Sequence, residues 1–168
     1  FDIAEGNEYE LAQWLSDHKV DIAFTSYQVG SSYDFIPICD DPMLAVMPKD
    51  HPFADYDEVP LELYGNAAFV VSDYTYLNDV HRILTAANIT PDIKYTSHND
   101  YSILSMVEHN LGISILPALV LKGKTGNFTA RPLKPNAYRR LGIAVASAET
   151  MSPAMKVFVQ HAKEHLRI

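Results

Sequence analysis

The sequence predicts an α/β fold, in which helices pack on the faces of parallel sheets. Apolar runs typical of buried strands alternate with amphipathic helical segments through most of the 168 residues. Apolar residues make up 48% of the chain and charged residues 20%, as in ordinary globular proteins. A chain of this length can bury enough surface to fold without a disulfide or a metal. It therefore forms one large domain or two small ones.

The expected strands are short and mostly end at a proline or a polar pair. The tripeptide Asp40-Asp41-Pro42 is expected to break one extended segment, and Pro48 and Pro117 to end two others. The predicted strands cover residues 1–4, 20–24, 35–39, 44–47, 67–71, 93–96, 113–116, 128–133 and 141–147.

The expected helices have recognisable starts and apolar faces. Asn7 begins the first one, because Glu10 stands three residues on as in a capping box. Asn78 or Asp79 begins a second, Asn99 or Asp100 a third that ends at Gly112, and Ser152 the last. The residues predicted to face the core are Leu11, Trp14, Leu15, Val80, Ile83, Leu84, Ala87, Ile103, Val107, Leu111, Met155, Phe158, Val159, Ala162 and Leu166.

Three polar loops follow predicted strands, at residues 25–28, 72–78 and 97–100. In α/β sheets ligands bind beyond the carboxyl ends of the strands, close to helix N-termini. These loops are rich in hydroxyls and amides, which suit a small polar or carboxylated molecule. The alternative is that they only cap the strands in solvent.

Charge and cysteine content narrow the class of protein. The formal net charge is −8 and the pI about 5.2, so this part of the chain is not expected to bind nucleic acid. Cys39 is the only cysteine, which favours a reducing cytoplasm. No apolar run reaches the ~20 residues of a membrane span, and the acidic first residues do not form a signal peptide. Because the chain begins without Met and within a strand pattern, we expect it to be part of a longer polypeptide.

No motif predicts catalysis, a metal or a cofactor. His161 and His165 match the H-x-x-E-H spacing of zinc proteases, but this helix face is expected to be solvated and no third ligand follows. Gly123-Lys124-Thr125 resembles the end of a phosphate loop, yet Ala118 stands where its first glycine should be. Cys39 is interpreted as a small core residue rather than a nucleophile.

Several segments share the order and spacing of one regulator family. They are Glu5-Gly6 with Leu11 and Leu15, residues 20–24, 37–41, 44–48, 51–54 and 140–145, Val107-Glu108 with residues 111–117, and Ser152-Pro153 with Phe158. On these stretches the whole chain resembles the effector-binding domain of LysR-type transcriptional regulators. Asn110 departs from the pattern, where the family often has glycine at the end of a helix.

The resemblance implies two α/β subdomains with a cleft between them, similar to type II periplasmic binding proteins. Subdomain I would comprise residues 1–41 and 150–168, lacking an N-terminal strand and helix, and subdomain II residues 42–149. A small effector, with a carboxylate expected, would bind in the cleft and favour one of two conformations. The implied effector contacts are Thr25, Ser26, Tyr27, Ser72, Tyr74, Thr75, His98 and Asn99. The implied hinge residues are Asp41, Pro42 and Thr150.

The resemblance also implies partners that the chain itself does not contain. DNA would be bound only through an N-terminal winged helix-turn-helix domain, and the full-length protein would be a homodimer or homotetramer in the cytoplasm. One alternative is a solute-binding protein of a transporter, which an upstream signal peptide would indicate. Another is a small hydrolase or transferase, which loss of turnover on mutating Ser72 and His98 would reveal.

Overall fold

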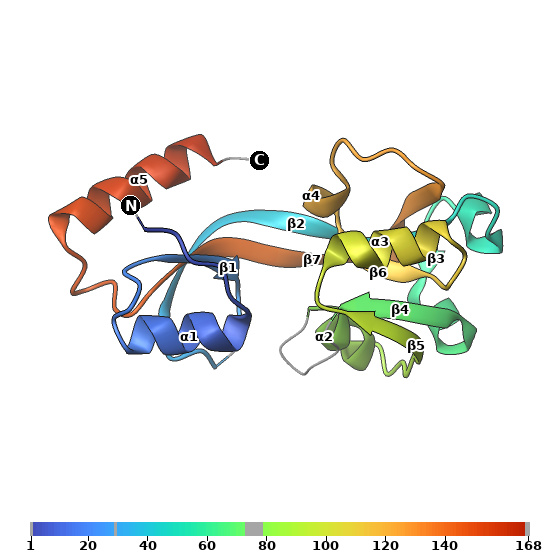
Figure 1. Ribbon diagram of the computed structural model, residues 1–168, viewed down its shortest axis with the longest axis horizontal. Coiled ribbons are helices and arrows are strands. Elements are labelled where there is room, and N and C mark those ends of the chain that lie inside the picture. Colours follow the sequence, from blue (N-terminus) through green and yellow to red (C-terminus); the bar gives the residue numbers. More distant parts are fainter. Residues whose placement is uncertain (1, 29, 73–78, 167–168) are drawn as a thin grey trace. The chain divides into compact units, whose positions relative to one another are not determined.

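The protein is a mixed α/β structure, seen in a computed structural model that describes residues 2–28, 30–72 and 79–166 (Figure 1). The α-helices are α1 (Glu8–Ser16), α2 (Asp79–Ala86), α3 (Asp100–Glu108), α4 (Ala118–Leu121) and α5 (Pro153–His165), and the 3-10 helices are η1 (Pro52–Asp55) and η2 (Leu61–Asn66). The strands are β1 (Ala23–Ser26), β2 (Asp34–Pro48), β3 (Val59–Pro60), β4 (Ala68–Ser72), β5 (Asp92–Ser97), β6 (Ser114–Pro117) and β7 (Phe128–Val145).

The strands form one sheet with the order β1-β7-β2-β6, in which β3 pairs with β7, and a second sheet of β4 and β5. The pairs β1/β7 and β2/β6 are antiparallel, whereas β4/β5 and β3/β7 are parallel. The prediction of an α/β fold is confirmed, but the expectation of parallel sheets holds only for β4/β5 and β3/β7 and is wrong for β1/β7 and β2/β6. Alternation of strands and helices fixes the element types, whereas strand direction depends on how long segments return to the sheet.

Two strands are much longer than expected. The tripeptide Asp40-Asp41-Pro42 does not break β2, and the segment between residues 133 and 141 does not interrupt β7. Pro42 is exposed in β2, a position where a strand tolerates a missing amide donor. The expected strand at residues 1–4 is also wrong for its described part, because residues 2–4 have no strand structure.

The chain divides into two compact units. Unit 1 comprises Phe1–Asp40 and Arg140–Ile168, and unit 2 comprises Asp41–Arg139. The chain therefore passes between the units inside β2 and again inside β7. The family resemblance implied a second passage near Thr150, whereas the units divide between Arg139 and Arg140.

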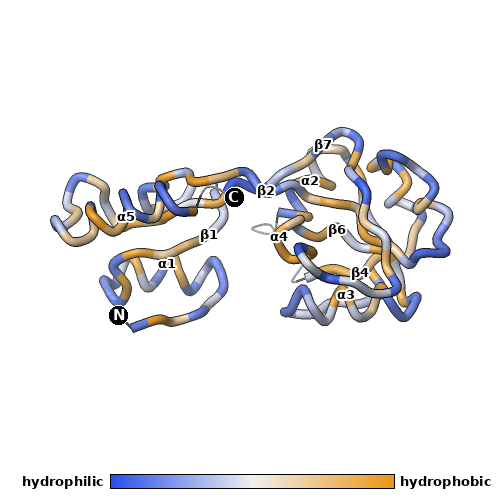
Figure 2. The backbone as a smooth tube through the Cα atoms, turned by 90° about the horizontal axis from the view of Figure 1, so that it is seen from above, coloured by the Kyte–Doolittle hydropathy of each residue, from blue (hydrophilic) through white to orange (hydrophobic). Residues whose placement is uncertain are grey.

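Unit 2 has a large apolar core. One cluster gathers side chains from β2, β4, β6, η2 and α2 around Tyr64 and Phe69, whose rings meet edge to face at 5.5 Å. A second cluster packs Ile103, Leu104 and Val107 of α3 against β4 and β6. The apolar β4 and α4 stand out in Figure 2.

Unit 1 has two smaller clusters. One packs Val159 and Ala162 of α5 on Ile143 and Val145 of β7, and the other surrounds Leu15 of α1. The caps predicted from the sequence are present: Asn7 and Glu10 form a capping box, and the Met155 amide donates to Ser152 Oγ at 3.2 Å. The helices α1 and α5 thus begin at the capping residues that the sequence predicted, Asn7 and Ser152.

The ends of α3 and α5 differ from the prediction. The helix α3 ends at Glu108 rather than near Gly112, since Asn110 adopts a left-handed conformation with φ of 61°. Gly112 instead allows close packing on β4, where an added Cβ would lie 2.6 Å from the carbonyl oxygen of Ala68. Leu111 and Leu166, expected in the core, are exposed.

Candidate functional site

The carboxyl ends of β4 and β5 bring two predicted loops together in unit 2. The strands are parallel, and Ser72 pairs in register with Ser97, so both hydroxyls lie at the same edge of the sheet. Both residues are half-buried. Parallel strands that end side by side and lead into helices are the usual place for a ligand in such sheets.

The loop after β5 is organised by hydrogen bonds into the start of α3. The Asn99 amide donates to Ser97 Oγ at 3.3 Å, and Asn99 Oδ1 accepts from the Tyr101 amide at 2.8 Å. The prediction that Asn99 caps this helix is confirmed. His98 and Asn99 are exposed, so the loop presents an imidazole and an amide to solvent. Figure 1 shows α3 beginning where β5 ends.

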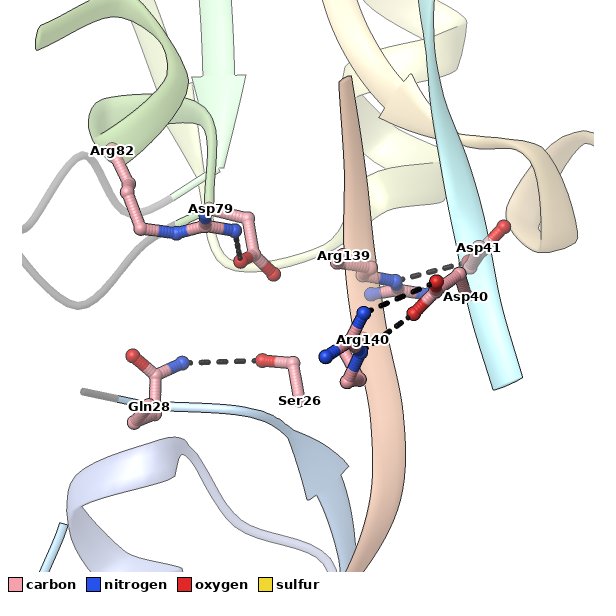
Figure 3. Close-up of polar contacts among 8 residues, drawn as sticks. All are labelled: Ser26, Gln28, Asp40, Asp41, Asp79, Arg82, Arg139 and Arg140. Atoms are coloured by element: carbon pink, nitrogen blue, oxygen red, sulfur yellow. Dashed lines mark hydrogen bonds and ion pairs between the residues drawn. The ribbon is translucent and has the colours of Figure 1, made fainter. Parts of the chain in front are cut away.

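Asp100, the first residue of α3, carries a perturbed carboxyl group. Partial burial raises its pKa, and the positive charge of Arg139 opposes that rise. The Arg139 side chain donates to Asp41 rather than to Asp100 (Figure 3). The polar edge of unit 2 therefore contains a desolvated carboxylate as well as neutral donors.

The helix α2 begins next to the other predicted loop. Arg82 donates to Asp79 Oδ1 at 2.8 Å within the first turn of α2, and the Asp79 side chain is largely buried (Figure 3). Tyr74 and Thr75, two of the predicted effector contacts, lie outside the described residues. Of the effector contacts predicted in the loop at residues 72–78, the structure describes only Ser72.

The predicted site residues of unit 1 follow β1. Thr25 is half-buried, Ser26 is buried, and Tyr27 is exposed with its ring 5.3 Å from that of Phe35. Gln28 Nε2 donates to Ser26 Oγ at 3.1 Å (Figure 3), and the Tyr27 amide donates to the Arg140 carbonyl at 2.8 Å. The end of β1 is therefore tied to β7.

Two ion pairs, which the sequence analysis missed, lie where the chain passes between the units (Figure 3). In unit 1, Arg140 Nε lies 2.8 Å from Asp40 Oδ1, and this pair is exposed. In unit 2, the Arg139 guanidinium lies 2.9 Å from Asp41 Oδ2, and Asp41 is buried. The sequence does contain a signal for them, because two neighbouring acidic residues stand at 40–41 and two neighbouring arginines at 139–140.

The predicted hinge residues have different surroundings. Asp41 and the exposed Pro42 stand at the passage inside β2. Thr150 lies in the segment between β7 and α5, where its hydroxyl donates to the Ser147 carbonyl at 3.4 Å. The residues at the passage inside β7 are Arg139 and Arg140.

Among the described residues, no group of three or more His, Cys, Asp or Glu side chains is placed to hold a metal ion. The rings of His161 and His165 stack at 4.0 Å on the exposed face of α5. The 123–125 segment is followed by β7 rather than by a helix, so it lacks the geometry of a phosphate loop. Cys39 is half-buried in β2.

No described helix has both the length and the apolar character to cross a membrane.

The chain belongs to the LysR substrate binding domain family, whose model matches residues 1–167. It is 28% identical over 162 residues to the HTH-type transcriptional regulator YvbU of Bacillus subtilis (strain 168), covering 95% of this chain and 55% of that protein. It is 25% identical over 153 residues to the Hca operon transcriptional activator HcaR of Escherichia coli (strain K12), covering 88% and 52%. The chain thus spans about half the length of the curated relatives it matches.

Solved structures show the same fold. The CcmR regulatory domain of Synechocystis PCC6803, in complex with 2-PG, aligns with a TM-score of 0.82 at 16% identity, covering 94% of this chain and 79% of that one. The effector binding domain of QuiR in complex with shikimate aligns with a TM-score of 0.79 at 22% identity, covering 95% and 80%. The predicted relationship to LysR-type effector-binding domains is confirmed.

Proposed function

We propose that this chain is the ligand-sensing domain of a LysR-type transcriptional regulator and binds a small polar metabolite. The observation that carries the proposal is the family match over residues 1–167, together with the polar strand ends of unit 2. The relatives are transcriptional regulators, which favours this role over a transporter's solute-binding protein and over a hydrolase or transferase.

The proposed ligand contacts come from both units. Ser72, His98 and Asn99 at the polar edge of unit 2 offer a hydroxyl, an imidazole and an amide. Ser97, which begins the polar loop at residues 97–100 but was not among the predicted contacts, adds a second hydroxyl. Thr25, Ser26 and Tyr27 of unit 1, with Tyr74 and Thr75, complete the proposed set. The cleft between residues 1–41 with 150–168 and residues 42–149, with its hinge at Asp41, Pro42 and Thr150, is part of the same proposal.

A carboxylate-bearing ligand is supported by the donors at the start of α3, where the helix dipole favours negative charge. The CcmR regulatory domain and the QuiR effector binding domain, which share this fold, have been solved in complex with 2-PG and with shikimate. The nearby carboxylate of Asp100 limits this preference, because it repels an anion. We therefore expect the ligand to present hydroxyl groups beside its carboxylate.

The whole protein would act on DNA through a helix-turn-helix domain outside these residues, as a homodimer or homotetramer in the cytoplasm. The ligand would act by binding one conformation of the sensing domain more tightly than another. The net charge of −8 is consistent with DNA binding by a different domain, since a DNA-binding surface needs positive charge.

A thermal-shift assay of the intact domain with hydroxylated carboxylates, 2-PG and shikimate included, tests the proposal. At a ligand concentration of one hundred times Kd, binding adds about 2.7 kcal/mol to the free energy of unfolding. We expect Ser72→Ala and Ser97→Ala to reduce the shift, whereas Thr85→Ala, an exposed hydroxyl on α2, leaves it unchanged. Absence of stabilisation by every compound in the panel would refute the proposal.

A further inference from the structure

Asp41 is a buried carboxylate at the point where β2 enters unit 2. Its side chain is only 1% exposed, and both of its oxygens accept hydrogen bonds. Oδ2 accepts from the Arg139 guanidinium, with Nε at 3.0 Å and a second nitrogen at 2.9 Å. Oδ1 accepts from the Leu119 amide at 3.1 Å, in the first turn of α4. One carboxylate thus joins β2, β7 and α4 within unit 2.

The apolar side of α4 extends this junction toward α3. Leu121 of α4 lies in one buried cluster with Ile103 and Val107 of α3. The helix α3 begins at Asp100, directly after the loop that carries two of the proposed ligand contacts. The positive charge of Arg139, whose side chain is 23% exposed, also acts on the Asp100 carboxyl group. The junction therefore reaches the proposed ligand-binding edge.

The neighbouring ion pair, between Asp40 and Arg140, joins the same residue types but is exposed to solvent. Asp40 and Arg140 lie one residue away on the same two strands, and both side chains are 47% exposed. An exposed pair of this kind contributes little, whereas a buried carboxylate is costly unless all its hydrogen bonds are made. Only the buried pair can fix neighbouring elements in one geometry.

We propose that Arg139 and Asp41 are positioning residues, which hold the start of α4, and through its apolar cluster the helix α3, to the strands that pass between the units. The proposal rests on the proposed function, since it assigns the pair to the ligand-binding edge of unit 2. Asp41 places α4 through the Leu119 amide, and Arg139 holds the Asp41 carboxylate in place. Movement of the α3 loop is then coupled to β2 and β7 at the passage.

Hydrogen-exchange mass spectrometry of the unliganded chain tests the structural part of this proposal. In Arg139→Gln, we expect amides in residues 99–107 and 117–122 to exchange at least tenfold faster, while unit 1 exchanges as before. Arg131→Gln is the matched control, because Arg131 lies on the same strand and donates both its Nε and a second nitrogen to the Ala54 carbonyl, at 3.3 and 3.1 Å. It should leave both segments unchanged.

The carboxyl group of Asp100 gives a second readout that a general loss of stability would not produce. Titration followed by carbon NMR should show a higher pKa for Asp100 in Arg139→Gln, a value close to that of the parent protein in Arg139→Lys, and no change in Arg131→Gln. Arg139→Lys retains the charge and also serves if the Gln variant fails to fold. Uniformly faster exchange across unit 2, or equal effects of the two Gln variants, would overturn the proposal. Neither measurement needs a ligand, so their failure leaves the thermal-shift result standing, and the reverse also holds.

Discussion

Units 1 and 2 share the strands β2 and β7 but bury very different amounts of apolar surface. Among the described side chains, the large fully buried ones belong mostly to unit 2, with Tyr64 and Phe69 at its centre. Unit 1 contributes only Leu15 and Ile143 to that set, and it leaves Val157 of α5 70% exposed. Since apolar burial is the main favourable term in folding, unit 2 should be the more stable of the two.

The difference indicates that the two units have different structural roles. Unit 2 holds the polar edge of β4 and β5 on a well-packed core, which keeps the loop residues in place. Unit 1 has only two smaller apolar clusters, and its helices α1 and α5 begin at side-chain caps. The only tryptophan, Trp14, lies in α1, so its fluorescence reports on unit 1 while circular dichroism reports on both.

The largest expected effect comes from emptying the core of unit 2. Phe69→Ala should lower the free energy of unfolding of unit 2 by about 3–5 kcal/mol, because Phe69 is completely buried. Urea denaturation followed by circular dichroism measures this loss. Tyr95→Ala, an exposed aromatic on β5, should change it by less than about 0.5 kcal/mol. If Trp14 fluorescence shifted equally with Phe69→Ala, the two units would unfold as one.

The second effect separates the two ion pairs. Asp41→Asn should cost about 3 kcal/mol, because it leaves the partly buried Arg139 charge without a carboxylate partner. Asp40→Asn removes the equivalent exposed charge and should hardly change stability. Thermal unfolding of both variants measures the contrast. Equal losses would mean that burial does not distinguish the pairs.

The third effect compares one helix cap from each unit. Asn99→Ala should cost about 1 kcal/mol in unit 2 and Ser152→Ala about 1 kcal/mol in unit 1, since each side chain accepts from a helix amide. Asn99→Ala should shift the circular dichroism transition and leave the Trp14 transition unchanged, whereas Ser152→Ala should shift the Trp14 transition. Asn99→Ser and Ser152→Asn keep a capping oxygen and should restore most of the loss. A shift of the Trp14 transition by Asn99→Ala would contradict independent units.

The smallest effect is a pH dependence confined to unit 2. The Phe53 amide donates to His51 Nδ1, which requires a neutral imidazole, and desolvation lowers the pKa of His51 below its ordinary 6.5. The folded state therefore binds the proton less tightly than the unfolded state, and unit 2 should lose stability as the pH falls below about 6.5.

Denaturation between pH 7.5 and pH 5 measures this loss. His51→Asn offers an uncharged acceptor at the same position and should flatten the dependence. An unchanged slope in that variant would place the pH-sensitive group elsewhere.

The sequence by itself predicted most of the elements and the residues that start them. Asn7, Asn99 and Ser152 were found because capping depends on side chains within three residues of each other. The α/β class followed from local periodicity, and the strand-end residues Ser72 and His98 from their places after apolar runs. The effector contacts all remain predictions, and two of them, Tyr74 and Thr75, lie outside the described residues.

Only the tertiary structure decided strand direction, the continuity of β2 and β7, and the pairing of Asp41 with Arg139. Asp41 and Arg139 are 98 positions apart, and no local pattern encodes such a contact. Asp40-Asp41-Pro42 indicated a break because charges and proline disfavour strands, yet a partner arginine and an exposed proline make the strand stable. Local propensity is thus overridden where a distant side chain compensates the cost.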